Sequence, residues 1–446
     1  MSNRLRRPLL CCATAAHALV LAGAARAQEP VPSPSPSPAP ETRAEHWRRL
    51  REAKKDALVP YRPTFLERQI LQFEKAEKPA ISTRNFHGFY PRVAGISSAS
   101  WIAPIVRFWQ PDIGGTRLSV HASAAYSLRG YELYDFQAGR MPHAGRALPP
   151  RSTRGDDVYE LGGVAKSTLD RLILYSSLRY RHNPRDGFYR LGADSRLEDR
   201  TSFLLQDATY ELVGGWQFGR RLVATGRFGY RQAFVGEGDQ PDVPTIGAVF
   251  DDTQAPGLAR QPDFWKASGL VLYDGRDRPF NPHRGGMVGL ELTRYDDRGS
   301  EEFAFTRMAL DARGYLTLGS PQRVLAVRGL FVRDEADQGS RVPFYMMDEL
   351  SDSHRLRGYR TFRYRGEKIV ALSAEYRWEA APALELALFT DAGRAYRPEE
   401  SWKVHGISAS LGFGIRLKTH EDVVLRLEVA GGTETTRAYL RFGPSF

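Results

Sequence analysis

Residues 405–417 read HGISASLGFGIRL, and this stretch decides the fold. From Ile407 to Leu417 every second residue is apolar, and the residues between them are glycine, serine or arginine. Successive side chains of a β-strand point to opposite faces, so one face of this strand is apolar and the other is small or polar. This pattern is typical of a strand with lipid on one side and water on the other.

Two preceding segments, 367–379 and 383–394, repeat the alternation and add a charge. The short turn 380–382 joins them. Because the period is two, the register places Glu375 and Asp391 on the face opposite the apolar residues. The two segments therefore predict successive strands that each carry one carboxylate into a lumen.

The same period runs along most of the chain and predicts an all-β fold, an antiparallel transmembrane β-barrel of about sixteen strands. An even number returns both termini to one side of the membrane. Long polar loops are expected at 139–154, 183–200, 237–261 and 335–366, with short turns between them. The predicted strands are 86–94, 97–109, 116–138, 155–167, 171–182, 201–218, 221–236, 262–274, 284–296, 302–318, 322–334, 367–379, 383–394, 404–417, 422–431 and 434–443.

Composition agrees with a barrel. The chain has 23 Phe, 20 Tyr, 7 Trp and 41 Gly, yet after residue 27 it has no apolar run of the ~20 residues that a membrane helix needs. A soluble β-sandwich or propeller is the rival fold. It would not account together for an export signal, such long strands and the aromatic last residue, Phe446.

The first 27 residues have the pattern of a secretory signal peptide. Arg4, Arg6 and Arg7 precede an apolar core, and a small-residue motif ends at Ala27, where we expect cleavage. A retained transmembrane helix is the alternative, but the apolar core is too short. Both cysteines lie within this segment, so no disulfide is expected after export.

Residues 28–80 predict a Pro-rich linker followed by short helices. Residues 30–40 alternate proline with small residues, which favours an extended spacer. The pattern at 41–58 is helical and basic, and a second short helix is predicted at 64–76. This region is either a periplasmic segment or a helix threaded through the pore as a plug, and the barrel itself is expected over 81–446.

The net charge of +11 has two readings. Solvated loops and a polar lumen account for it, and contact with outer-membrane lipids or lipopolysaccharide would also use it. Nucleic-acid binding is not expected, because the basic residues are dispersed and the protein is exported. The sequence predicts no enzyme, no cofactor and no metal site, although a Ser–His pair assembled from neighbouring strands, as in a lipase, stays open.

Several local motifs follow one another along residues 180–446. Phe188-Tyr189-Arg190-Leu191-Gly192 comes first, and Leu356-Arg357-Gly358-Tyr359 lies in the longest late loop. Glu375-Tyr376-Arg377 and Phe389-Thr390-Asp391-Ala392-Gly393 follow on the two acidic strands. A turn motif lies between the first two of these motifs. It comprises Asp274, Arg276, Asp277, Pro279, Asn281, Pro282 and Gly285.

In this order the motifs resemble the outer-membrane superfamily of barrel-assembly (BamA-type) and translocation-assembly (TamA-type) proteins and two-partner-secretion transporters, also called bacterial surface antigens. The match is most specific over 262–446, and Arg190 stands where the family usually has glycine. The resemblance implies that the arginine loop folds into the barrel and is locked there. The implied lock residues are Arg357, Gly358, Tyr359, Glu375, Asp391 and Gly393.

Two further features qualify this resemblance. Leu128-Arg129-Gly130-Tyr131 is the same tetrapeptide as 356–359, so the motif by itself also fits an ordinary surface turn. At the other end, Phe442 and Phe446 share one alternation face and predict a C-terminal signal by which a barrel-assembly machinery inserts this chain.

The resemblance implies a non-enzymatic barrel that helps protein or lipid into or across the outer membrane. The periplasmic polypeptide-binding (POTRA) modules of the family have no counterpart in the sequence, so a separate periplasmic partner is one expectation. The alternative function is a passive channel or structural barrel that kept the fold without assembly activity. The sequence leaves both open.

Overall fold

The structure is a computed structural model that describes residues 42–57, 65, 68, 88–97, 99–110, 113–141, 171–278, 281–299, 302–398, 400–403, 405–418 and 423–442. Several predictions concern residues outside these ranges: the signal peptide, the Pro-rich spacer, most of the helix at 64–76, the strand at 155–167, Pro279 and Phe446. The described residues belong to two units, Met1–Arg62 and Pro63–Phe446, each considered by itself.

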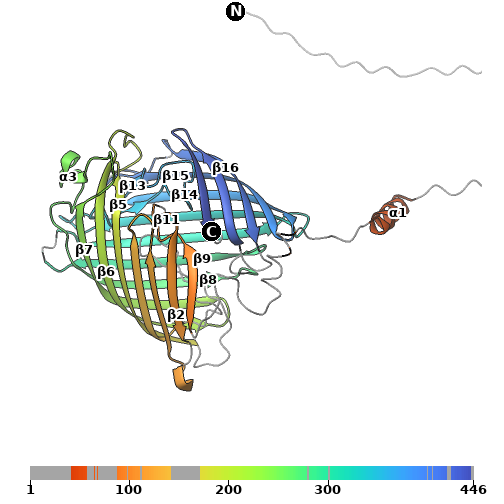
Figure 1. Cartoon of the computed structure of the whole chain (residues 1–446), viewed down its shortest axis with the longest axis horizontal. Coiled ribbons are helices and arrows are strands. Elements are labelled where there is room, and N and C mark those ends of the chain that lie inside the picture. The colour runs from red at the N-terminus through yellow and green to blue at the C-terminus, as the bar shows by residue number, and fades with distance from the viewer. Residues whose placement is uncertain are drawn as a thin grey trace, which may run out of the picture. The chain divides into compact units, whose positions relative to one another are not determined.

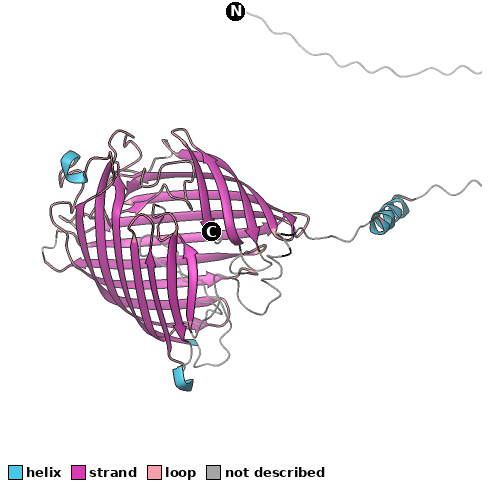
Figure 2. Ribbon diagram, viewed as in Figure 1, coloured by secondary structure: helices cyan, strands magenta, loops and turns pink. Residues whose placement is uncertain are grey.

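The second unit is a single antiparallel sheet of sixteen strands, in which each strand pairs with its neighbours along the chain (Figure 1). The ribbon curves into a barrel wall (Figure 2). The strands are β1 Phe89–Ala94, β2 Ala103–Gln110, β3 Ser119–Tyr126, β4 Glu132–Arg140, β5 Leu172–Phe188, β6 Thr201–Phe218, β7 Leu222–Glu237, β8 Phe264–Asp274, β9 Gly285–Asp297, β10 Phe305–Thr317, β11 Arg323–Ala336, β14 Lys368–Ala381, β15 Leu384–Tyr396, β16 Ser408–Lys418, β17 Val423–Gly431 and β18 Thr436–Phe442.

The sheet order skips two strands because they lie in a loop. β12 (Asp348–Glu349) and β13 (Arg365–Gly366) pair with each other inside the segment that joins β11 to β14. Two short helical turns lie between described strands of the unit: η2 (Ile113–Gly115) and α3 (Ile246–Val249). The antiparallel barrel class predicted from sequence is thus confirmed.

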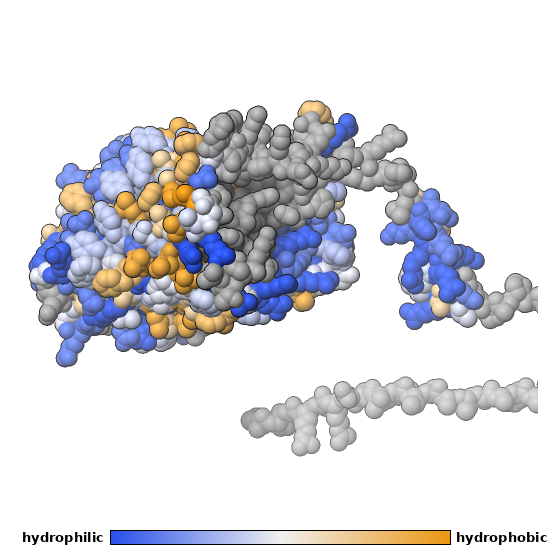
Figure 3. Space-filling model, turned by 90° about the horizontal axis from the view of Figure 1, so that it is seen from below, coloured by the Kyte–Doolittle hydropathy of each residue, from blue (hydrophilic) through white to orange (hydrophobic). Residues whose placement is uncertain are grey.

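Side chains alternate between the two faces of the wall. On β16, Leu411, Phe413 and Ile415 are exposed, whereas Ser410 before them and Arg416 after them are buried. Apolar residues likewise appear as orange patches on the outer surface, between hydrophilic regions (Figure 3). A sheet in water would bury its apolar face, so this inverted pattern is that of a wall whose outside meets lipid.

One predicted strand was wrong. The segment 116–138 is not a single strand but the hairpin β3–β4, which turns at 127–131. Hydrogen bonds from Ser127 N to Tyr131 O (2.8 Å) and from Gly130 N to Ser127 O (3.0 Å) close the turn. The alternating pattern continues across a turn this short, so periodicity alone gives no sign of the break. The hairpin supplies one strand more than predicted. The strand predicted at 155–167 lies outside the described residues, and the described sheet has sixteen strands.

The two end strands of the sheet are its shortest main strands. β1 has six residues and β18 has seven, compared with eighteen in β6. Among the described residues no ladder joins β1 to β18. The two strands nevertheless approach each other, because a Cβ on Gly95, next to β1, would lie 3.6 Å from Nη1 of Arg441 on β18.

The first unit contributes one described helix, α1 (Arg43–Asp56). Thr42 caps its N-terminus in a capping box with Glu45, and Lys54 and Lys55 lie in its last turn. These residues satisfy the end groups and complement the helix dipole. None of the helices within the described residues is both long and apolar enough to cross a membrane.

Candidate functional site

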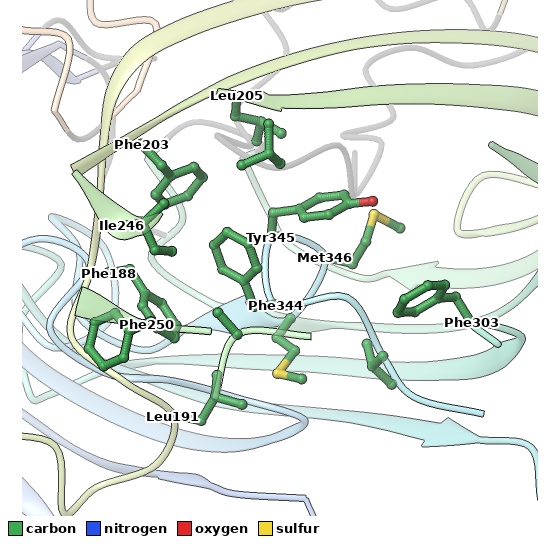
Figure 4. Packing of buried hydrophobic residues seen from close by; sticks show 14 of the residues in the cluster. Phe188, Leu191, Phe203, Leu205, Ile246, Phe250, Phe303, Phe344, Tyr345 and Met346 are labelled. Carbon is green, nitrogen blue, oxygen red and sulfur yellow. The ribbon is translucent and has the colours of Figure 1, made fainter. Parts of the chain in front are cut away.

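The loop 337–367 between β11 and β14 is buried along most of its length. Its first part, Val342–Met347, packs in an apolar cluster with side chains from β5, β6, β8 and β10. Figure 4 shows Phe344 between Phe188 and Phe203, with Tyr345 and Met346 beside them. The ring centroid of Phe344 lies 5.1 Å from that of Phe188 and 5.0 Å from that of Phe203. This part of the loop is therefore held by the early strands.

Two arginines extend the attachment of the loop. Arg365 is 1% exposed and donates to the carbonyl oxygens of Phe344 (3.1 Å) and Gly187 (3.3 Å). Arg363 pairs with Glu434 in the β17–β18 turn (2.8 Å) and also donates to Ser195 in the β5–β6 loop. Arg363 thus ties a loop of the early strands to the last hairpin of the sheet.

The tip of the loop carries Arg357, whose side chain is completely buried. Its Nε and Nη2 donate to the two oxygens of Asp391 at 2.8 and 2.7 Å, and Nη1 donates to Glu375 at 2.7 Å. Glu428 lies 3.6 Å away, and the guanidinium stacks 3.5 Å from the ring centroid of Phe389. We call Arg357, Glu375, Asp391 and Glu428 the arginine clamp.

The arginine clamp lies within a larger set of buried charges on the lumen face. Arg416 links two clamp carboxylates, with Nη2 at 3.0 Å from Glu375 and 2.9 Å from Glu428. Each member of this set is at most 3% exposed, and the set holds as many positive as negative side chains. They are Arg357, Arg377, Arg416, Arg426, Glu375, Glu385, Asp391 and Glu428.

Burial makes this arrangement sensitive to the loss of one partner. Burial lowers the pKa of Arg357, but the carboxylates of Asp391 and Glu375 more than offset this, so its pKa lies above the ordinary value. A bidentate, charge-assisted pair is among the stronger side-chain contacts. Removing one member of a buried pair leaves an uncompensated charge and costs about 3–5 kcal/mol. The clamp therefore holds the loop in one position.

The backbone near Arg357 binds the last strands as well. Tyr439 on β18 donates its hydroxyl to the carbonyl oxygen of Arg357 (2.8 Å). The hydroxyl of Tyr359 contacts Ala409 O on β16 (3.2 Å) and Thr433 Oγ1 in the β17–β18 turn (2.9 Å). Together with Glu375 and Asp391, these contacts attach the loop tip to elements of β14 through β18.

Gly358 and Gly393 allow this close approach. A Cβ on Gly358 would lie 2.5 Å from Ser410 Cβ and 2.6 Å from Gly432 N, and one on Gly393 would lie 2.6 Å from Leu350 Cδ1. The φ of Gly358 is not in the left-handed region that favours glycine. The structural reason for glycine at 358 is lack of space.

The turn motif lies between β8 and β9. Arg276 pairs with Asp274 at 2.7 Å, and an oxygen of Asp277 accepts from the backbone N–H of His283 and Arg284. Gly285 has φ +93°, and a Cβ on it would clash with Gly275 O, so a side chain would not fit there. Asn281 and Pro282 are both buried. The turn also contacts Thr317 on β10. The structure brings none of the motif's described residues to the arginine clamp.

Two other motifs have distinct outcomes. Arg190, which stands where the resembled family has glycine, has φ +79°, a conformation that glycine adopts at less cost. Phe442 closes β18 and is partly exposed, on the same alternation face as exposed Leu440. Glu428, Arg416 and Tyr439 also contribute to the site and were not predicted, although strand alternation places all three on the lumen face.

Metal chemistry has no candidate in the part of the chain that the structure describes. No three histidine, cysteine or acidic residues there are grouped as metal ligands would be.

Fold and site together define a class: a transmembrane β-barrel in which the loop 337–367 is buried and fixed by an arginine. Comparison with known families agrees. The family model of the Omp85 superfamily domain matches residues 167–430. The chain belongs to the Omp85 superfamily, and its place is accordingly the bacterial outer membrane.

Among solved structures, the chain is similar to BamA from Haemophilus ducreyi lacking POTRA domains 1–3, with a TM-score of 0.53 and 13% identity over 81% of this chain and 70% of that one. CdiB from Acinetobacter baumannii gives 0.44 and 11% over 79% and 58%, and CdiB from Escherichia coli gives 0.46 and 10% over 79% and 61%. The chain thus spans less than two thirds of either CdiB chain. No curated protein matches it.

Proposed function

We propose that this barrel assists the insertion or passage of polypeptide, or of lipid, at the outer membrane without catalysing a chemical reaction. The arginine clamp carries this proposal. It attaches the loop to β14–β18, while the described parts of β1 and β18 share no ladder. The wall is then firmly held on one side of the β1–β18 seam and weakly joined at the seam itself.

A weak seam has a physical use in lipid. Backbone N–H and C=O groups without partners are costly in the hydrocarbon core, so an open strand edge favours pairing with another strand. The six residues of β1 and seven of β18 offer few hydrogen bonds to each other. An incoming β-strand can replace those few bonds, which supports assisted insertion as the activity.

A passive channel is the second candidate, and the lumen supports it. Buried ion pairs such as Arg227–Glu291 (3.3 Å) and Lys266–Glu211 (3.0 Å) line the inner face of strands far from the arginine clamp. Polar lumen walls are typical of water-filled barrels. The buried residues Val342–Met347 count against a wide pore, because they pack inside the barrel.

Other proposals concern how the chain reaches and serves the membrane. Residues 1–27 act as a signal peptide, and Phe442 with Phe446 forms the signal that the barrel-assembly machinery reads. Residues 28–80 act as a periplasmic segment, and a separate periplasmic protein delivers the client.

The experiment compares wild type with Arg357→Ala and Arg129→Ala in liposomes that receive an unfolded client barrel. Arg129 belongs to the identical tetrapeptide, so it is a matched control. We expect wild type and Arg129→Ala to speed client insertion, measured by protease protection, and Arg357→Ala to lose this effect. No acceleration by wild type, together with a large and stable conductance in planar bilayers, would establish the passive channel instead.

A further inference from the structure

The charges of α1 are sorted onto separate sides of the helix. At about 100° per residue, Glu45, Glu52 and Asp56 fall within about 40° of one another on one side. Trp47 and Leu50 lie on roughly the opposite side and are 51% and 47% exposed. No residue of α1 is buried. The helix therefore has an acidic side and an apolar side, both uncovered.

The basic residues of α1 form two groups, those with an acidic residue three or four positions away and those without one. Arg48, Arg49 and Lys55 each have an acidic residue three or four positions away, so ordinary pairing along the helix accounts for them. Arg43 and Lys54 have none at these spacings, and they fall between Trp47 and Leu50 around the helix. Arg51, equally without an acidic neighbour, borders this side.

We propose that the side of α1 formed by Arg43, Trp47, Leu50, Arg51 and Lys54 binds the surface of an anionic phospholipid bilayer. An amphipathic helix with basic residues beside tryptophan and leucine lies in the headgroup region of such a membrane. The acidic side faces away, where a negative surface repels it least. The proposal is independent of any assembly activity.

The length of chain permits this placement. Roughly 30 residues separate α1 from β1, and an extended chain covers at most ~3.5 Å per residue, or about 100 Å. The helix can therefore reach the bilayer in which the barrel itself resides. Each basic residue near an anionic surface strengthens binding about five-fold, so the three residues together contribute about 100-fold.

The test uses the chain from residue 28 onward, as signal-peptide cleavage leaves it, which contains no cysteine because Cys11 and Cys12 are the only two in the sequence. A spin label is placed at Leu50→Cys or, as control, at Glu52→Cys on the acidic side. In bilayers containing phosphatidylglycerol, we expect the label at 50 to meet oxygen more often than a water-soluble nickel complex. The label at 52 should stay accessible to nickel.

A pair of triple variants tests the role of charge. Alanine at Arg43, Arg51 and Lys54 should lower the association constant of the helix for the membrane about 100-fold. Alanine at Arg48, Arg49 and Lys55 removes the same charge from the other side and should change it less than about three-fold. Equal effects of the two variants would overturn the proposal.

Two other outcomes would also overturn it. Protection of position 50 in detergent without phospholipid, or equally in zwitterionic bilayers, would mean that protein covers this side of the helix, as in a pore plug. Equal accessibility of positions 50 and 52 in anionic bilayers would mean that the helix binds nothing.

Discussion

The sequence Leu-Arg-Gly-Tyr occurs twice, and the two copies have opposite environments. Leu128 is 78% exposed, whereas Leu356 is completely buried. Arg129 donates to Ala99 O (3.2 Å) and stacks 4.1 Å from the ring of Trp101, whereas Arg357 is held by buried carboxylates. The comparison shows that the tetrapeptide specifies no function. Its surroundings decide whether it is a hairpin turn or a clamp.

The glycines and the tyrosines of the two copies also have different environments. Gly130 has φ +76° and room for a side chain, whereas Gly358 has no positive φ and no room. Tyr131 is buried, and its hydroxyl has no hydrogen-bond partner in the structure. Tyr359 has two. Each position of the tetrapeptide therefore offers a matched pair of variants.

The largest difference is expected at arginine. Arg357→Ala removes the guanidinium that pairs with buried Asp391, and it removes one of the partners of Glu375. It should lower the free energy of unfolding by about 3–5 kcal/mol. Arg129→Ala removes a partly buried hydrogen bond and cation–π contact and should cost about 1 kcal/mol. Denaturant titration followed by heat-modifiable gel mobility measures both. Equal losses would show that Arg357 has no special role.

The second largest difference in stability is expected between the two leucine variants. Leu356→Ala opens a cavity in a buried cluster and is expected to cost about 2–5 kcal/mol. Leu128→Ala changes an exposed side chain and should alter stability by less than about 0.5 kcal/mol. The same titration is the measurement. A neutral Leu356→Ala would mean that the loop is not packed against the wall in the folded protein.

For the two glycines, the expected losses of stability are similar in size but have different causes. Gly358→Ala places a methyl group against Ser410 and the backbone of Gly432, and overpacking costs about 1–3 kcal/mol. Gly130→Ala puts a side chain at φ +76° and should cost about 1–2 kcal/mol by backbone strain. Only Gly358→Ala should also reduce client insertion in liposomes. Reduction by both variants would remove the distinction.

The tyrosines give the smallest effect, with opposite signs. Tyr359→Phe loses the hydrogen bonds of its hydroxyl to Ala409 and Thr433 and should destabilise the protein by about 1 kcal/mol. Tyr131→Phe removes a hydroxyl that is buried without a partner and should be neutral or stabilising. Paired denaturant titrations compare them. Destabilisation by Tyr131→Phe would reveal a partner for that hydroxyl.

Strand alternation made much of this site predictable. It placed Glu375 and Asp391 in the lumen, because a period of two leaves only two registers and the apolar residues choose between them. It also put Glu428 there, although the sequence gives no reason to single that residue out. The pair Arg363–Glu434 could not be predicted, because it joins irregular segments 71 residues apart. A loop has no period from which its position can be inferred.

The two attachments of the long loop also differ in how far along the chain they reach. Arg357 meets Glu375 and Asp391 at separations of 18 and 34 residues, whereas Arg365 and Arg363 reach Gly187 and Ser195 across 178 and 168 residues. Closing short loops costs less entropy and happens sooner. Arg357 can therefore nucleate β14 and β15 during folding, before the early strands meet the loop. In pulse-labelling hydrogen exchange, amides of β14 and β15 should then gain protection before those of β5 and β6, and the reverse order would refute this folding sequence.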